Sequence, residues 1–169
     1  MEEAWLRGPI DGIDPLLMPV AHALVQVRED VDRLAREVPP DHAWERPGGA
    51  ASIGFHLRHI GGALDRLFTY ARGETLSDAQ RATLRIEEAP GDPAASLVAV
   101  ARDVGLLIDR ALDQLRATPR DELVVPRRVG RAGLPSTVAG LLFHAAEHST
   151  RHAGQAMTTA RILAGSARG

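Results

Sequence analysis

The chain has 169 residues, of which 44% are hydrophobic, so it can bury one core but is too short for two independent domains. We therefore expect a single domain over residues 1–169. All 20 basic residues are arginines and stand against 22 acidic residues, and a net charge of −2 without a run of like charges argues against nucleic acid as a partner. Because the sequence contains neither lysine nor cysteine, Schiff-base chemistry, disulfides and thiolate ligands are excluded, and any metal must be held by imidazole or oxygen.

The first half of the chain predicts two long helices. Apolar residues recur at helical spacing over residues 14–38, although Pro19 lies within the first turns and leaves the exact start open. A second segment of this kind covers residues 52–72, with Ser52 suited to the N-cap position and Gly73 to the C-terminal end.

The second half predicts a short helix over residues 77–87 and a long helix over residues 92–118, with Pro93 in its first turn. Residues 122–135 contain an apolar run followed by two glycines, which indicates a loop or a small hairpin. A last long helix is expected over residues 136–163. The pattern predicts an all-α protein, a four-helix bundle with a short extra helix and an irregular or hairpin segment before the last helix.

Five of the seven histidines fall in two predicted helices, His56 and His59 in the second and His144, His148 and His152 in the last. At about 100° of rotation per residue, His148 and His152 lie about 40° apart on an apolar face, so both imidazoles should point toward the core. An i,i+4 histidine pair is well suited to hold one metal ion. The second helix offers a further ligand in His56 or His59, and spacing does not select between them.

Other interpretations of these residues stay open on the sequence alone. A single histidine on an apolar face is more often a core residue that hydrogen-bonds a carbonyl or carboxylate than a metal ligand. The clustering favours a metal site without excluding core histidines. Gly61 and Gly62, inside the second helix, predict a close approach of another helix.

Two segments, SIGFHLRH at residues 52–59 and HAAEHSTRHAGQ at residues 144–155, resemble the DinB-like family of metal-dependent enzymes. In that family a four-helix bundle binds its metal through one histidine of the second helix and a His-x-x-x-His pair of the last. The resemblance implies that His59, rather than His56, joins His148 and His152 as the metal ligands. His144 is an addition to the family pattern and is a candidate fourth ligand, catalytic base or uninvolved neighbour.

The resemblance also implies a function. Three imidazoles leave a coordination position open, and zinc or nickel suit them best, with iron and manganese as further options. Related bundles include bacillithiol- and mycothiol-dependent enzymes, so the first hypothesis is a low-molecular-weight-thiol S-transferase with His144 as the candidate catalytic base. The alternatives are a non-catalytic metal-binding bundle of a stress response and a hydrolase that activates water at the metal.

The expected partners follow from the same considerations. They are a small-molecule substrate, such as a low-molecular-weight thiol, and a second copy of the chain, because dimers are common among resembling proteins. The N-terminal residues lack a basic stretch followed by an apolar run, and no window reaches the roughly 18 apolar residues of a membrane span. We therefore expect a cytoplasmic protein without a membrane partner.

Overall fold

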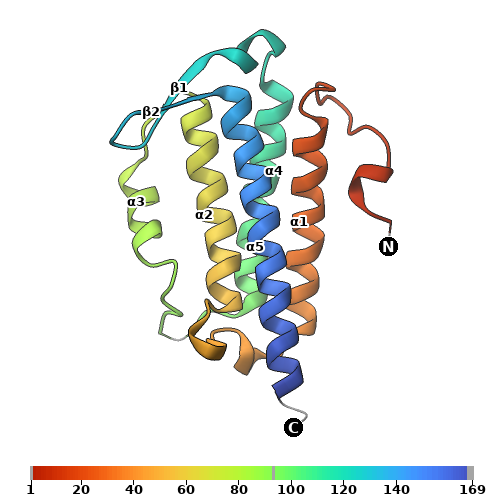
Figure 1. Ribbon diagram of the computed structural model, residues 1–169, viewed down its shortest axis with the longest axis vertical. Helices are drawn as coiled ribbons and strands as arrows, with labels where there is room; N and C mark the ends of the chain where they lie inside the picture. The colour runs from red at the N-terminus through yellow and green to blue at the C-terminus, as the bar shows by residue number, and fades with distance from the viewer. Residues whose placement is uncertain (1, 93, 167–169) are drawn as a thin grey trace.

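The computed structural model describes residues 2–92 and 94–166. Its frame is a bundle of four long helices, α1 (Met18–Glu37), α2 (Ile53–Ala71), α4 (Leu97–Ala117) and α5 (Val138–Ser166) (Figure 1). The short helix α3 (Asp78–Arg85) lies outside the bundle beside α2, and a hairpin of β1 (Pro126–Val129) and β2 (Leu134–Thr137) precedes α5. The predicted all-α four-helix bundle, with a short extra helix and a small hairpin, is confirmed.

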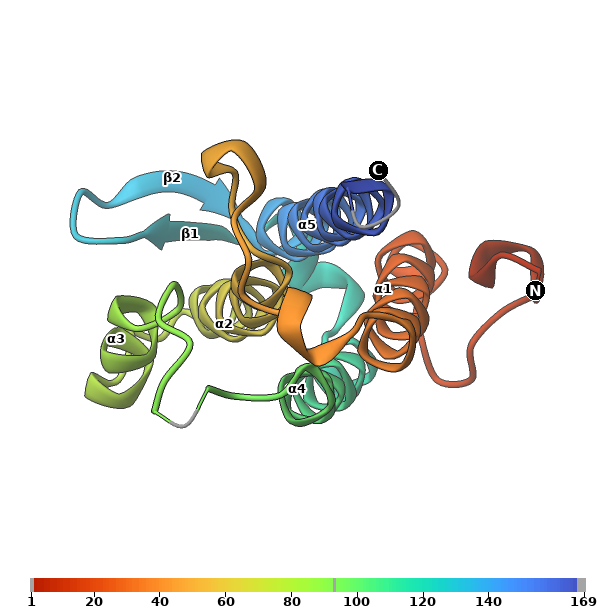
Figure 2. The same ribbon diagram turned by 90° about the horizontal axis from the view of Figure 1, so that it is seen from below.

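Each long helix turns an apolar stripe toward one shared core. Helix α2 packs against α5 and α4, and α1 packs against the same two helices from the other side (Figure 2). On α2 the side chains of Leu57, Ile60 and Leu64 are at most 1% exposed, which matches their i, i+3, i+7 spacing. Burying each such side chain contributes about 1.5–3 kcal/mol to stability. This core fixes α2 against α5.

The ends of α2 follow the predicted signals. The Oγ atom of Ser52 accepts a hydrogen bond from the backbone N–H of Phe55 at 3.1 Å, which satisfies one of the free donors of the first turn. After the helix, Gly73 adopts a φ of 80°, a conformation that glycine reaches without strain. The N-terminal cap matters because His56 and His59 lie in the first two turns of the helix that it begins.

Three predicted helix starts are too early, and the smallest difference is that of α5, which begins at Val138 rather than at residue 136 because residues 134–137 form β2. Helix α1 begins at Met18 rather than at residue 14, with Pro19 in the first turn, where its missing N–H is not needed. Helix α4 begins at Leu97 rather than near residue 92, because Ser96 caps it by accepting a hydrogen bond from the backbone N–H of Ala99 at 3.2 Å. Pro93, on which the earlier start depended, lies outside the described residues.

The segment before α5 is the small hairpin that the sequence left undecided. Strands β1 and β2 pair antiparallel, from Pro126 opposite Thr137 to Val129 opposite Leu134. A short 3₁₀ helix (Arg120–Val124) connects α4 to this hairpin. None of the described helices is both long and apolar enough to cross a membrane.

Candidate metal centre

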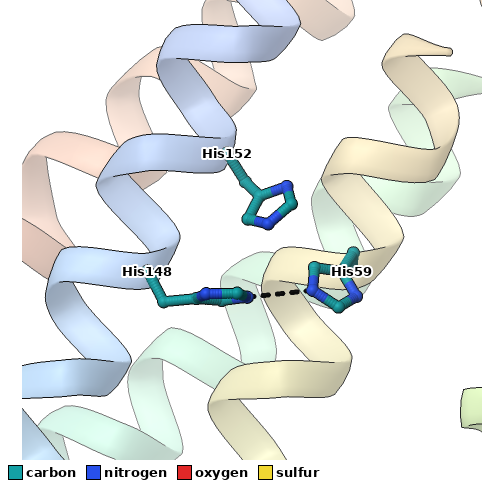
Figure 3. A group of neighbouring side chains, drawn as sticks. All are labelled: His59, His148 and His152. Carbon is teal, nitrogen blue, oxygen red and sulfur yellow. Dashed lines mark hydrogen bonds between the residues drawn. The ribbon is translucent and has the colours of Figure 1, made fainter. Parts of the chain in front are cut away.

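The interface between α2 and α5 brings three imidazoles together. His59 extends from α2 while His148 and His152 extend from successive turns of α5, and the three rings point toward one another (Figure 3). One ring nitrogen from each lies within 4.8 Å of those of the other two. Nε2 of His59 and Nε2 of His148 are 2.9 Å apart. We call these three side chains the histidine triad.

The donor set of the triad fits a divalent metal ion. Zinc–nitrogen bonds are about 2.0–2.1 Å long, so two imidazole nitrogens on one tetrahedral ion lie about 3.3 Å apart. The contact of 2.9 Å between His59 and His148 and the upper limit of 4.8 Å for the group bracket this value. No other cluster of histidine, aspartate or glutamate within residues 2–92 and 94–166 has a comparable arrangement. The triad therefore fits a metal-binding protein, and its geometry alone leaves the metal's identity open.

The electrostatic surroundings keep His148 and His152 neutral. Burial, reinforced by the neighbouring His59, lowers the pKa of His148 to about 4. Burial and the same neighbour also lower the pKa of His152 to about 4. Both rings therefore carry a free nitrogen lone pair at neutral pH, which is the form that binds a metal.

His56, the other candidate on α2, lies behind the triad rather than within it. Its side chain is 6% exposed, and its Nδ1 is 3.0 Å from Nδ1 of His152. Burial lowers the pKa of His56, with a smaller contribution from His59. Because His56 occupies the Nδ1 side of His152, Nε2 is the remaining ring nitrogen of His152.

His144, the candidate base, lies at the edge of the triad. It lies one turn before His148 in α5, and the two ring centres are 5.5 Å apart. Its side chain is 52% exposed, and its Nδ1 is 3.3 Å from a carboxylate oxygen of Glu147. The structure thus places His144 next to the triad and open to solvent.

Glu87, which sequence reasoning did not identify, orients His59. It follows the end of α3, is 3% exposed, and its Oε2 accepts a hydrogen bond from Nδ1 of His59 at 2.6 Å. Its other oxygen, Oε1, accepts from Nη1 of Arg66 at 2.5 Å. A carboxylate on Nδ1 places the proton there and leaves Nε2 free, as is usual for histidines that bind metals.

The carboxyl group of Glu87 stays ionised despite its burial. Burial alone would raise its pKa, but the hydrogen bonds from His59 and Arg66 outweigh this effect, so the pKa of Glu87 is lowered. Gly62 on α2 makes room for the group, since a Cβ at this position would lie 2.2 Å from Oε1 of Glu87. The neighbouring Gly61 faces α4, where a Cβ would lie 3.0 Å from Leu107, so the predicted close helix approach is confirmed for Gly61 only.

A signal for Glu87 was present on α2. His59, Gly62 and Arg66 follow the i, i+3, i+7 spacing of one helix face. An arginine on a partly buried face requires an acidic or carbonyl partner, and a glycine beside it indicates a group that approaches closely. The spacing could have predicted a carboxylate at this place without identifying which one.

Comparison with known proteins agrees with this geometry. No curated protein matches the chain. The model of the DinB superfamily matches residues 23–156, a range that includes α2, Glu87 and the whole histidine triad. The chain belongs to the DinB superfamily.

Proposed function

We propose that His59, His148 and His152 hold one divalent metal ion, zinc or nickel before iron or manganese, and that the protein is a low-molecular-weight-thiol S-transferase. The observation that carries this proposal is the set of three converging imidazoles, two of them backed at Nδ1 by Glu87 and His56. Three nitrogen ligands leave a coordination position for substrate, which distinguishes catalytic from closed structural sites. When bound, the metal would act as a Lewis acid that favours the thiolate form of a thiol.

The thiol has to come from outside, because the chain has no cysteine. Reduced thiols are a feature of the cytoplasm, so the cytoplasmic location is part of the proposal. The surroundings of the triad suit a small organic substrate, since the ring of Phe55 stacks on His59 with centroids 5.3 Å apart and covers one side of it. An aromatic wall of this kind excludes water from one approach to the site.

His144 is the proposed base. It is exposed and adjacent to His148, so it can accept the proton of a thiol that approaches the triad from solvent. In the proposed reaction the sulfur of the thiol forms a bond to an electrophilic carbon of the second substrate. The leaving group departs with the electron pair of its former bond, and the thiol proton passes through His144 to solvent.

Monochlorobimane and bacillithiol, with mycothiol in a parallel assay, provide a direct test of transfer. The expected products are the fluorescent thioether and chloride, formed only when metal, protein and thiol are all present. His144→Gln should lower the rate by about 100-fold, within the usual range for a general base, without loss of metal. His22→Gln, a change on α1, is the control and should leave the rate unchanged.

Two results would contradict the proposal in different ways. Turnover of p-nitrophenyl acetate without any thiol, together with no thioether formation, would make the protein a hydrolase. A protein with a full complement of metal and no turnover in either assay would contradict the proposed transferase and favour the non-catalytic metal-binding bundle. Either result would leave the metal site itself standing.

A further inference from the structure

A cleft of about 400 Å³ lies between α2, α3 and α4. Figure 2 shows α3 and α4 on sides of α2 that do not face α5, and none of the triad histidines lines the cleft. One wall is apolar and consists of Ile86, Ala95, Ala99, Val100, Val104 and Leu107. The volume lies within the range of small-molecule sites, which is about 300–1,000 Å³.

The cleft exists because α3 does not pack into the bundle. None of the eight residues of α3 is buried. The helix is attached mainly through Gln80, whose Nε2 donates to Oδ2 of Asp65 and to Oγ1 of Thr69, both at 2.7 Å. On α2, Gly61 and Gly62 line the cleft, and their lack of side chains lets Leu107 and Glu87 approach the helix closely.

Arg66 supplies a polar anchor inside this space. The residue lines the cleft and is 9% exposed, yet only Nη1 of its guanidinium has an acceptor, the carboxylate of Glu87. Within the described part of the chain, Nε and Nη2 of Arg66 have no protein hydrogen-bond partner, and both are open to the solvent of the cleft. The N–H groups of Nε and Nη2 point in parallel, which is the fork that a carboxylate meets with two hydrogen bonds.

The free donors of Arg66 favour a ligand with a single carboxylate and an apolar body, because three carboxylates, those of Asp65, Glu87 and Asp103, already line the cleft. Asp65 already accepts from Gln80, and Glu87 is shared between Arg66 and His59. Arg58 adds a second positive charge to the lining. A ligand that places its carboxylate on Arg66 and its hydrocarbon part on the apolar wall would satisfy the free donors and cover the apolar surface.

We propose that this cleft binds a small, largely apolar carboxylate, held by Nε and Nη2 of Arg66. The site is separate from the histidine triad and does not require the metal, so it goes beyond the function proposed above. The guanidinium that holds the ligand also contacts the carboxylate that orients His59.

The probe for this site is 2-naphthoate, an aromatic carboxylate small enough for the cleft, titrated into metal-free protein and followed by its fluorescence. Two variants of α3 form a matched pair, because Ala79 lines the cleft whereas Ala82 is exposed on the same helix and does not line it. Ala79→Phe should weaken binding by about tenfold or more, and Ala82→Phe by less than about twofold. Equal affinities in the two variants, or no saturable binding by the wild type, would overturn the proposal.

A second probe tests the anchor without disturbing Glu87. 2-Naphthylmethanol has nearly the same size and no charge, so it should bind about tenfold more weakly than 2-naphthoate if Arg66 holds the carboxylate. Equal affinities for the two probes would show that Arg66 does not hold the carboxylate. Binding of 2-naphthoate only by metal-loaded protein would place the probe on the triad and would also overturn the proposal.

Discussion

Helix α2 meets its neighbours in two different ways. Toward α5 and the shared core it packs through fully buried side chains such as Leu57 and Ile60, and the histidine triad is set into the interface with α5. Toward α3 it makes contact through single polar groups, those of Gln80 and Glu87, and leaves a cleft. The first side is held by many small apolar contacts and the second by a few directional hydrogen bonds.

This difference shows how the site is built. The tightly packed side determines where the triad histidines lie, because α2 and α5 cannot shift without opening the core. The loosely packed side contributes one carboxylate, Glu87, that reaches α2 and fixes the orientation of His59. Position and orientation thus come from different sides of the same helix, and each can be changed without the other.

The largest effect should follow from filling the space that Glu87 occupies. In Gly62→Ala the new Cβ would lie 2.2 Å from Oε1 of Glu87, so the buried carboxylate must shift and its hydrogen bonds to His59 and Arg66 are strained. We expect the free energy of unfolding, measured with urea on metal-free protein, to fall by about 3 kcal/mol.

Gly105→Ala on α4 is the matched control for this change. A Cβ there has no neighbouring atom within 4 Å, so alanine should stabilise the helix by up to about 1 kcal/mol. Changes of the same sign and size in both variants would show that the place beside Glu87 has no special role.

Removing the charge that orients His59 should weaken metal binding without loss of the fold. For Glu87→Gln we expect the affinity for zinc, measured by competition with a chromophoric chelator, to fall by about 10- to 100-fold. Glu88→Gln, a change at the exposed neighbouring residue, is the control and should bind zinc like the wild type. An unchanged zinc affinity in Glu87→Gln would show that the α3 side of α2 does not influence metal binding on the α5 side.

The stability of metal-free protein should depend on pH through His148 and His152. Each has a pKa of about 4 in the folded chain. An unfolded histidine has a pKa of about 6.5, so between these values the unfolded state binds more protons than the folded state. Stability should therefore be full above about pH 7 and decrease as the pH falls toward 4.

The measurement is thermal unfolding between pH 7 and 5, a window above the usual pKa of glutamate. A double variant, His148→Gln with His152→Gln, should show a smaller decrease in melting temperature than the wild type over this range. The same decrease in both proteins would mean that other groups, such as the buried His56, dominate the pH dependence.

The smallest effect should come from the attachment of α3. Gln80→Ala removes two hydrogen bonds to α2 in a helix without buried residues, so global stability should change by about 1 kcal/mol or less. Hydrogen exchange should detect faster opening of α3, with the amides of α2 as the internal reference. Equal acceleration in both helices would show that α3 is part of the cooperative core.

The two sides of α2 also differ in what the sequence could predict. The bundle and the convergence of His148 and His152 follow from helical periodicity, which is a local property. The choice between His56 and His59 depends on the rotation of α2 against α5, and only the family resemblance favoured His59. Glu87 was expected at the end of a short helix over residues 77–87 but lies in the turn after α3, so its contact with His59 depends on how α3 crosses α2, which no local pattern encodes.

The central claim is that the triad holds a metal ion, and the metal content of protein purified without a histidine tag tests it most directly. Elemental mass spectrometry on the wild type should find about one zinc or nickel per chain, the stoichiometry of a single three-histidine site. His148→Ala and His152→Ala should each lose the metal, whereas His22→Ala, a change on α1 at a side chain that contacts the backbone oxygen of Gly8, should retain it. A wild type that is isolated without metal and does not bind added zinc or nickel would contradict the claim and leave the triad as core histidines.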